Sequence, residues 1–277
     1  MKIYITGLPS GYEVEHLVRL FYPMAPLTLT APEDGEDCVW AEKKPDGLWA
    51  MVRERGKSKT ARALLPDIET PEFALASLTY DLLRAWTGIR PPWGKMTGVR
   101  PVRLIHDKRA AGWSEEDIDQ FFLGRFDCSR QKYQMAKAIA DLQEPILKAG
   151  SVPKTYSLYI GIPFCPSRCS YCSFVSCNLD RDRKMVQPYV DCLCREVEEI
   201  KAQADKAGLT LCSIYIGGGT PTSLSADQLR QLMGTVRENF DLSQVMEYTV
   251  EAGRPDCTDA EKLAVIKEYG ATRISIN

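Results

Sequence analysis

The stretch from 156 to 177 constrains this chain more than any other part of its sequence. A β-rich apolar run over 156–162 is followed at once by Cys165, Cys169 and Cys172, spaced C-x3-C-x2-C. A short run of apolar and aromatic residues that ends at a proline predicts a β-strand. The sequence therefore predicts a strand that carries three thiols in the loop at its end.

Three thiols in one loop suit a cubane iron–sulfur cluster. Cysteine thiolates are the usual ligands of such clusters, and three of them leave the fourth iron open to a substrate or cofactor. A zinc site is the first alternative, but it usually takes four ligands from two C-x2-C pairs or from cysteine with histidine. The chain has only His16 and His106, and no second C-x2-C pair follows the loop. Ordinary core cysteines are the second alternative. Ligand counting favours the cluster, with Cys165, Cys169 and Cys172 as its metal ligands.

Composition narrows the classes of protein to consider. The 277 residues allow two domains or one large one, and a net charge of −2 gives no electrostatic case for nucleic acid. Residues 1–7 lack the features of a secretory signal, and no run approaches ~18 consecutive apolar residues, so we expect no membrane span. Ten cysteines in such a chain fit a reducing cytoplasm, where clustered thiols bind metal more often than they pair.

Residues 1–150 carry none of the cluster chemistry and predict an N-terminal extension that is α+β and then helical. The acidic charge balance weighs against a helix-turn-helix interpretation of its later helices. The segment 95–103, KMTGVRPVR, leaves two interpretations open, a phosphate or carboxylate site and a solvated loop packed on the following domain. The expected strands are 1–7, 37–43 and 48–54, and the expected helices are 13–22, 71–87, 114–123 and 129–148.

Residues 151–277 alternate between strand and helix patterns, with 150–153 as the linker. This alternation predicts parallel strands joined by helical crossovers. The expected strands are 156–162, 211–216, 248–251 and a fourth from 272, and the expected helices are 185–202 and two that begin with capping boxes at Ser225 and Thr258. Functional residues of such folds gather where strands end, and the cysteine loop, the GGGTPT run at 217–222 and Glu251 each follow a strand.

The same residues resemble a known family. The run YIGIPFCPSRCSYC at 159–172 resembles the cluster loop of radical S-adenosylmethionine (SAM) enzymes. Together with GGGTPT it is similar to the oxygen-independent coproporphyrinogen III oxidase/dehydrogenase group, which also includes haem chaperones. The MTGVRP stretch resembles a Bacillus-type coproporphyrinogen dehydrogenase with an N-terminal extension. The resemblance implies an α/β fold in which 151–277 form about the first half of a partial (β/α)6 radical-SAM barrel, preceded by the region 1–150.

The resemblance also implies the cofactors and the residues that bind them. The cofactors are a [4Fe-4S] cluster and S-adenosyl-L-methionine, and no catalytic residue is singled out. Glu251 ends an otherwise apolar strand, where an unpaired carboxylate is costly, so it pairs either with the cofactor or in a structural salt bridge. The two tyrosines are alternatively plain core. The implied SAM-binding residues are Tyr159, Tyr171, Gly218, Gly219, Thr220 and Glu251.

The implied activity is the oxidative decarboxylation of coproporphyrinogen III propionates to vinyls, giving protoporphyrinogen IX, by a 5′-deoxyadenosyl radical in haem biosynthesis. The implied partners are the porphyrinogen substrate and an electron donor such as flavodoxin or ferredoxin. Two alternatives remain open. One is a haem chaperone of the same family that binds the cluster and transfers haem, and the other is a radical SAM enzyme that acts on another substrate.

The sequence departs from the family pattern in three places. The decarboxylases carry a further cysteine two positions after the third ligand, whereas here Ser173 and Phe174 follow and the next cysteine is Cys177. Cys177 is either a displaced functional thiol or an ordinary buried thiol, and we favour the second interpretation. Gly161 stands where many members have histidine. The chain also stops at Asn277, inside the expected fourth strand, so we expect a fragment of a longer protein that is inactive alone.

Overall fold

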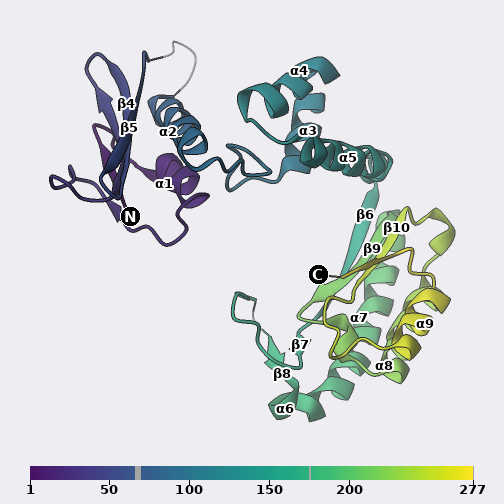
Figure 1. The fold of residues 1–277 in the computed structure, drawn as a ribbon. Coiled ribbons are helices and arrows are strands. Elements are labelled where there is room, and N and C mark those ends of the chain that lie inside the picture. The colour runs from purple at the N-terminus through teal and green to yellow at the C-terminus, as the bar shows by residue number, and fades with distance from the viewer. Residues whose placement is uncertain (66–69, 175, 277) are drawn as a thin grey trace. The chain divides into compact units, whose positions relative to one another are not determined.

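The computed structural model of this chain describes residues 1–65, 70–174 and 176–276. The chain forms two compact units, Met1–Asp141 and Leu142–Asn277 (Figure 1). This division falls inside one helix, α5 (Arg130–Gly150), and the expected domain boundary at 150 stays a prediction. Asn277, the last residue of the expected barrel half, lies outside the described residues. None of the described helices is long and apolar enough to span a bilayer.

The first unit begins with a five-stranded sheet in the order β2-β1-β3-β4-β5. Alternate side chains of its strands point toward α1 and α2, and they include the fully buried Val39, Ala41, Ala50 and Val52. The strands are β1 (Lys2–Thr6), β2 (Leu27–Thr28), β3 (Cys38–Lys44), β4 (Gly47–Glu54) and β5 (Lys57–Ala63), and the helices are α1 (Tyr12–Arg19) and α2 (Pro71–Thr87). The predicted strands and helices of this region are present, and β2 and β5 are additional.

A helical cluster completes the first unit. It consists of α3 (Pro101–Ala110), α4 (Glu115–Asp119), the π-helical turn η1 (Gln120–Arg125) and the start of α5. Lys95, from the segment with two open interpretations, is 9% exposed and donates to Ser77 Oγ at 2.6 Å and to Asp81 Oδ2 at 3.0 Å. Its ammonium group is therefore bound within the unit. Arg103 pairs along its own helix with Asp107.

The second unit is built on four parallel strands in the order β11-β10-β9-β6, which is their order along the chain. Helices connect successive strands, so the predicted α/β alternation is present. The main elements are β6 (Thr155–Ile162), α7 (Val186–Ala207), β9 (Thr210–Gly218), α8 (Ala226–Asn239), β10 (Glu247–Glu251), α9 (Ala260–Glu268) and β11 (Arg273–Ser275). The short elements are β7 (Phe164–Cys165), β8 (Cys177–Asn178), α6 (Leu179–Asp182), η2 (Arg183–Met185), η3 (Pro221–Ser223) and η4 (Leu242–Gln244).

The sheet of the second unit has one covered face and one open face. Leu158, Ile160 and Ile162 of β6 are buried in the core formed with α7, α8 and α9, which lie along one side of the sheet (Figure 1). Successive side chains of a strand point to opposite faces, so Tyr159 lies on the other side and is 62% exposed. It stacks on Tyr215 of β9, its register partner, with ring centroids 5.9 Å apart. The open face thus collects the polar and aromatic side chains.

Local capping sets the start of each crossover helix. Ser225 and Gln228 form the predicted capping box of α8, since the side-chain oxygen of each accepts a hydrogen bond from the backbone amide of the other. The prediction for α9 was wrong by one residue. Asp259, and not Thr258, is its N-cap and accepts from the backbone of Lys262 at 2.9 Å. A carboxylate at this position also interacts favourably with the positive end of the helix dipole.

Tyr248 in β10 offers a test of the core. Its side chain is 1% exposed, and its hydroxyl has no hydrogen-bond partner among the described residues. Burial raises its pKa. Because an unsatisfied buried hydroxyl costs about 1–3 kcal/mol, we expect Tyr248→Phe to raise the free energy of unfolding by about 1 kcal/mol.

Urea unfolding of the whole chain, followed by circular dichroism, measures this change. Tyr189→Phe is the matched control, because the Tyr189 hydroxyl donates to the Gly161 carbonyl at 2.6 Å. It is expected to lower the free energy of unfolding by about 1 kcal/mol. A Tyr248→Phe chain less stable than wild type contradicts the prediction.

Candidate functional site

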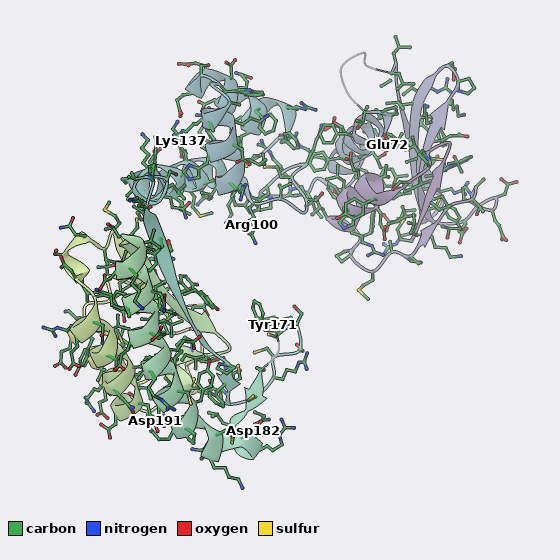
Figure 2. The ribbon with its side chains drawn as sticks, turned by 180° about the vertical axis from the view of Figure 1, so that it is seen from behind. Glu72, Arg100, Lys137, Tyr171, Asp182 and Asp191 are labelled. Atoms are coloured by element: carbon green, nitrogen blue, oxygen red, sulfur yellow. The ribbon has the colours of Figure 1, made fainter. Side chains whose placement is uncertain are left out.

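The cysteine loop is closed at its base by backbone pairing. β7 and β8 pair in parallel, with Phe164 opposite Cys177, and the Cys177 amide donates to the Pro163 carbonyl at 2.7 Å. Between them the loop extends beyond the two short strands, and Tyr171, 86% exposed, lies on it (Figure 2). The backbone thus fixes both ends of the segment that carries the three predicted ligands.

The three cysteines line one pocket of about 170 Å³ together with residues from two other strand ends. The glycine loop after β9 forms a second side of this pocket, and the end of β10 forms a third. The predicted site residues among its lining are Cys165, Cys169, Cys172, Tyr171, Gly218, Gly219, Thr220 and Glu251. Tyr159 lies instead in a neighbouring pocket of about 180 Å³, which shares Gly218 and Gly219 with the first. The structure therefore brings the predicted residues together, and their roles stay predictions.

The three thiols of the pocket are the donor type that an iron–sulfur cluster uses. All ten cysteines are free thiols, so none of the three is consumed by a disulfide. Within 1–65, 70–174 and 176–276, no three His, Cys, Asp or Glu side chains lie close enough together to hold one metal ion. A cubane is larger than one ion, and its thiolates surround four irons rather than one. Three free thiols line one pocket, and their number matches three of the four irons of a cubane.

The glycine loop approaches the cysteine loop so closely that a side chain would not fit. A Cβ on Gly219 would lie 2.8 Å from the Phe164 carbonyl oxygen and 2.9 Å from Cys165 Sγ. The Gly219 amide donates to the Ile162 carbonyl at 2.7 Å, and the Thr220 amide donates to the Phe164 carbonyl at 2.9 Å. Thr220 Oγ1 lies 3.4 Å from Cys165 Sγ. Backbone hydrogen bonds thus join the glycine loop to the start of the cysteine loop, next to Cys165.

Gly218 has a different reason to be glycine. Its φ of +110° is a conformation that side chains of L residues rarely adopt. The turn after β9 therefore exposes backbone groups to the pocket without side-chain obstruction.

Glu251 is held by a neighbouring phenol. The Tyr215 hydroxyl donates to Glu251 Oε1 at 2.6 Å. Burial, followed by this carboxylate, raises the pKa of Tyr215 to about 12 from 10.0. A raised pKa stabilises the protonated phenol, so this stabilisation is fully present below pH 10 and is lost as pH rises through about 12. At neutral pH the phenol is therefore protonated and donates to Oε1 of the carboxylate.

The sequence interpretation missed two residues of this site. Tyr215 was part of an expected strand, but its contact with Glu251 depends on the register of β9 and β10. Arg254 follows β10 and donates to Cys169 Sγ at 3.3 Å. The sequence feature that could have pointed to Arg254 is its place three positions after Glu251, because the end of that strand was expected to lie in the site. Cys177, in contrast, begins β8 and packs against the core.

Glu251 provides the first test of the pocket. We expect Glu251→Gln to weaken SAM binding about tenfold, because a hydrogen bond to a charged group contributes about 1.5–3 kcal/mol and each 1.4 kcal/mol is tenfold. Anaerobic equilibrium dialysis with SAM measures the dissociation constant.

Glu247→Gln is the matched control. Glu247 lies on the same strand and the same face, but at the other end of β10, where it accepts from Thr249 and pairs with Arg273. It is expected to leave SAM binding unchanged. If both variants lost the same affinity for SAM, the effect would come from the negative charge of β10 in general and not from the position of Glu251.

Comparisons with known proteins address the same stretch. The model of the radical SAM superfamily matches residues 159–277. The chain is 37% identical over 204 residues to the oxygen-independent coproporphyrinogen-III oxidase-like protein HemZ of Bacillus subtilis, which covers 71% of this chain and 40% of that protein. It is 42% identical over 120 residues to the heme chaperone HemW of Bacillus subtilis, covering 43% of this chain and 30% of the relative.

A further relative carries an enzyme's name. The oxygen-independent coproporphyrinogen III oxidase of Pseudomonas aeruginosa is 35% identical over 124 residues, covering 43% of this chain and 26% of that protein. The chain spans less than half the length of each of these relatives. The 204-residue alignment is longer than the stretch from 159 to 277, so that likeness extends into the region before the cysteine loop.

Proposed function

We propose that this chain, which belongs to the coproporphyrinogen III oxidase family of radical SAM proteins, is the cofactor-binding part of an oxygen-independent coproporphyrinogen III dehydrogenase. The family uses a [4Fe-4S] cluster and SAM. One observation carries the proposal, namely that the three cysteines share a pocket with the glycine loop and Glu251. Each of these comes from a different strand end, which is where βα folds bind ligands.

Each part of the pocket has a separate task in this proposal. Cys165, Cys169 and Cys172 would hold the cluster by three of its irons, which would leave one iron accessible to SAM. When bound, the cluster and SAM together supply a carbon-centred radical that abstracts hydrogen from the substrate. The backbone of the glycine loop would contact SAM, and Glu251, which accepts a hydrogen bond from Tyr215, would accept hydrogen bonds from it. The protein thus positions the cofactors and excludes side reactions.

The proposed substrate is coproporphyrinogen III, whose propionates lose carbon dioxide to become vinyls. The names of the two oxidase relatives support it. A low-potential donor of the flavodoxin or ferredoxin type would supply electrons to the cluster. The proposed compartment is the cytoplasm, where reducing conditions keep the ten thiols free.

Haem transfer is the second candidate. It is favoured by the 42% identity to a relative named as a heme chaperone and by Ser173 and Phe174, which stand where the decarboxylases carry another cysteine. In that case the pocket would bind the same cluster, and the chain would take up haem without cleaving SAM.

The test is anaerobic reconstitution of the chain with iron and sulfide, followed by electron paramagnetic resonance of the dithionite-reduced protein with and without SAM. The expected result is a cubane signal that shifts when SAM is added, and release of 5′-deoxyadenosine on reduction. A stoichiometric zinc without a cubane contradicts the whole proposal. A cubane that is indifferent to SAM, in a chain that binds haem, supports the chaperone instead.

A further inference from the structure

Arg254 joins the end of β10 to the cysteine loop. Its Nη1 donates to the Ser167 carbonyl at 3.2 Å and to Cys169 Sγ at 3.3 Å, and its Nη2 donates to Ser167 Oγ at 3.0 Å. The side chain is 20% exposed and lines the pocket of the three cysteines. A residue far along the chain therefore contacts both the backbone of the loop and the sulfur of a predicted ligand.

The guanidinium is fixed from its other edge by Asp256. Nε donates to Asp256 Oδ1 at 3.0 Å, and Nη2 donates to Oδ2 at 2.5 Å. These two parallel hydrogen bonds fix the plane of the guanidinium group. A lysine ammonium has no such plane and could not be oriented in this way. With one edge on Asp256, the opposite edge is presented to the loop in a single orientation. The arrangement differs from a lone surface ion pair, in which the cation has no further task.

A hydrogen bond to a ligand sulfur changes the energy of an iron–sulfur cluster. Reduction adds negative charge that is shared with the thiolates, so a donor and a positive charge at the sulfur stabilise the reduced form more than the oxidised one. Hydrogen bonds to the sulfurs and net charge are among the factors that set cluster potentials. Second-shell partners of this kind also orient the ligand.

We propose that Arg254 is a positioning residue that raises the reduction potential of the cluster by donating a hydrogen bond to Cys169 Sγ. This inference rests on the cluster site of the proposed function. Arg254 acts through Cys169 and contacts no reacting atom. Its contribution is to make the electron transfer from a biological donor to the cluster less unfavourable.

The test is a redox titration of the reconstituted 277-residue chain without SAM, followed by electron paramagnetic resonance. In Arg254→Met the ratio of reduced to oxidised cluster at a fixed potential is expected to fall about tenfold, which is about 59 mV for a one-electron couple. Arg254→Gln keeps a polar group in the pocket, but its shorter side chain cannot reach the sulfur. If Arg254→Met assembles the cluster poorly, Arg254→Gln is expected to show the same fall in reduction potential. Arg254→Lys keeps the charge without the fork, and its potential is expected to lie between wild type and Arg254→Met.

Arg168→Met is the matched control. Arg168 lines the same pocket, but its Nη2 donates to the Cys172 carbonyl at 3.4 Å and to no sulfur. Its loss removes the same charge from the pocket but no hydrogen bond to a ligand sulfur, so the potential is expected to fall clearly less than in Arg254→Met. Equal shifts in Arg254→Met and Arg168→Met would overturn the inference, because bare charge would then explain both.

Two further outcomes separate this inference from the proposed function. A variant with a full cluster, an unchanged potential and weaker SAM binding overturns the inference and makes Arg254 a ligand of SAM. A wild-type chain that takes up no cubane overturns the proposed function and this inference with it.

Discussion

Replacing Cys169 with alanine is expected to abolish the cubane signal and to reduce iron in the reconstituted chain to background. Loss of an outer-shell partner of a metal typically costs about 10–100-fold in affinity, and loss of a direct ligand costs more. Two of the three cysteine thiols that line the pocket would then remain. Iron and sulfide analysis with electron paramagnetic resonance measures the effect.

Cys177→Ala is the matched control for this prediction. Cys177 is also a free, partly buried thiol close to the loop, but it is the first residue of β8 and packs against the core. Its substitution is expected to leave the cluster content at the wild-type level. If Cys177→Ala lost the cluster and Cys169→Ala kept it, the ligand assignment would be wrong, although the loop would still be the site.

Adding one methyl group at Gly219 is expected to have an effect of comparable size. The Cβ would meet the Phe164 and Ile162 carbonyl oxygens at 2.8 and 3.1 Å and Cys165 Sγ at 2.9 Å. Two of these contacts are with backbone, which cannot move aside as a flexible side chain can. Overpacking typically costs about 1–3 kcal/mol, so we expect Gly219→Ala to lower the free energy of unfolding by about 2 kcal/mol and to displace the first predicted ligand.

Gly161→Ala is the control for the glycine prediction. A Cβ on Gly161 would lie 3.5 Å from Tyr159 Cε1, which is an ordinary van der Waals contact. Gly161 lies in β6, which belongs to the same sheet as β9. We expect a normal cluster content and a change in unfolding free energy below about 0.5 kcal/mol. Urea unfolding and iron content report the two effects separately. Equal behaviour of the two variants would remove the steric argument.

Much of the second unit was predictable because its elements carry strong periodic patterns. The sequences of β6, β9 and β10 either alternate between apolar and polar residues or are apolar throughout, and turn residues bound them. The capping box at Ser225 indicates the start of α8. Parallel strands with helical crossovers place their ends on one side, so the sequence also indicated which segments would share a pocket.

The parts that sequence failed to predict depend on contacts between distant residues. β5 was missed because its sequence, KSKTARA, has no apolar alternation. It is an edge strand, where exposed charged residues are common. In α5 the buried side chains are Tyr133, Ala136 and Ala140, whereas the apolar Met135 and Ile139 are exposed. Periodicity indicates a helical face, but only packing decides which face is buried.

The pairing of β7 with β8 has a consequence for damage and repair. It makes the cysteine loop resemble a macrocyclic ligand, because the hydrogen bonds that join its two ends are made by the polypeptide itself. The entropy of closing the loop is lost during folding and not during cluster assembly. When oxygen destroys the cluster, we therefore expect the β7–β8 pairing to keep the loop closed at its base. Rebuilding it then requires iron, sulfide and electrons, and no refolding of the polypeptide.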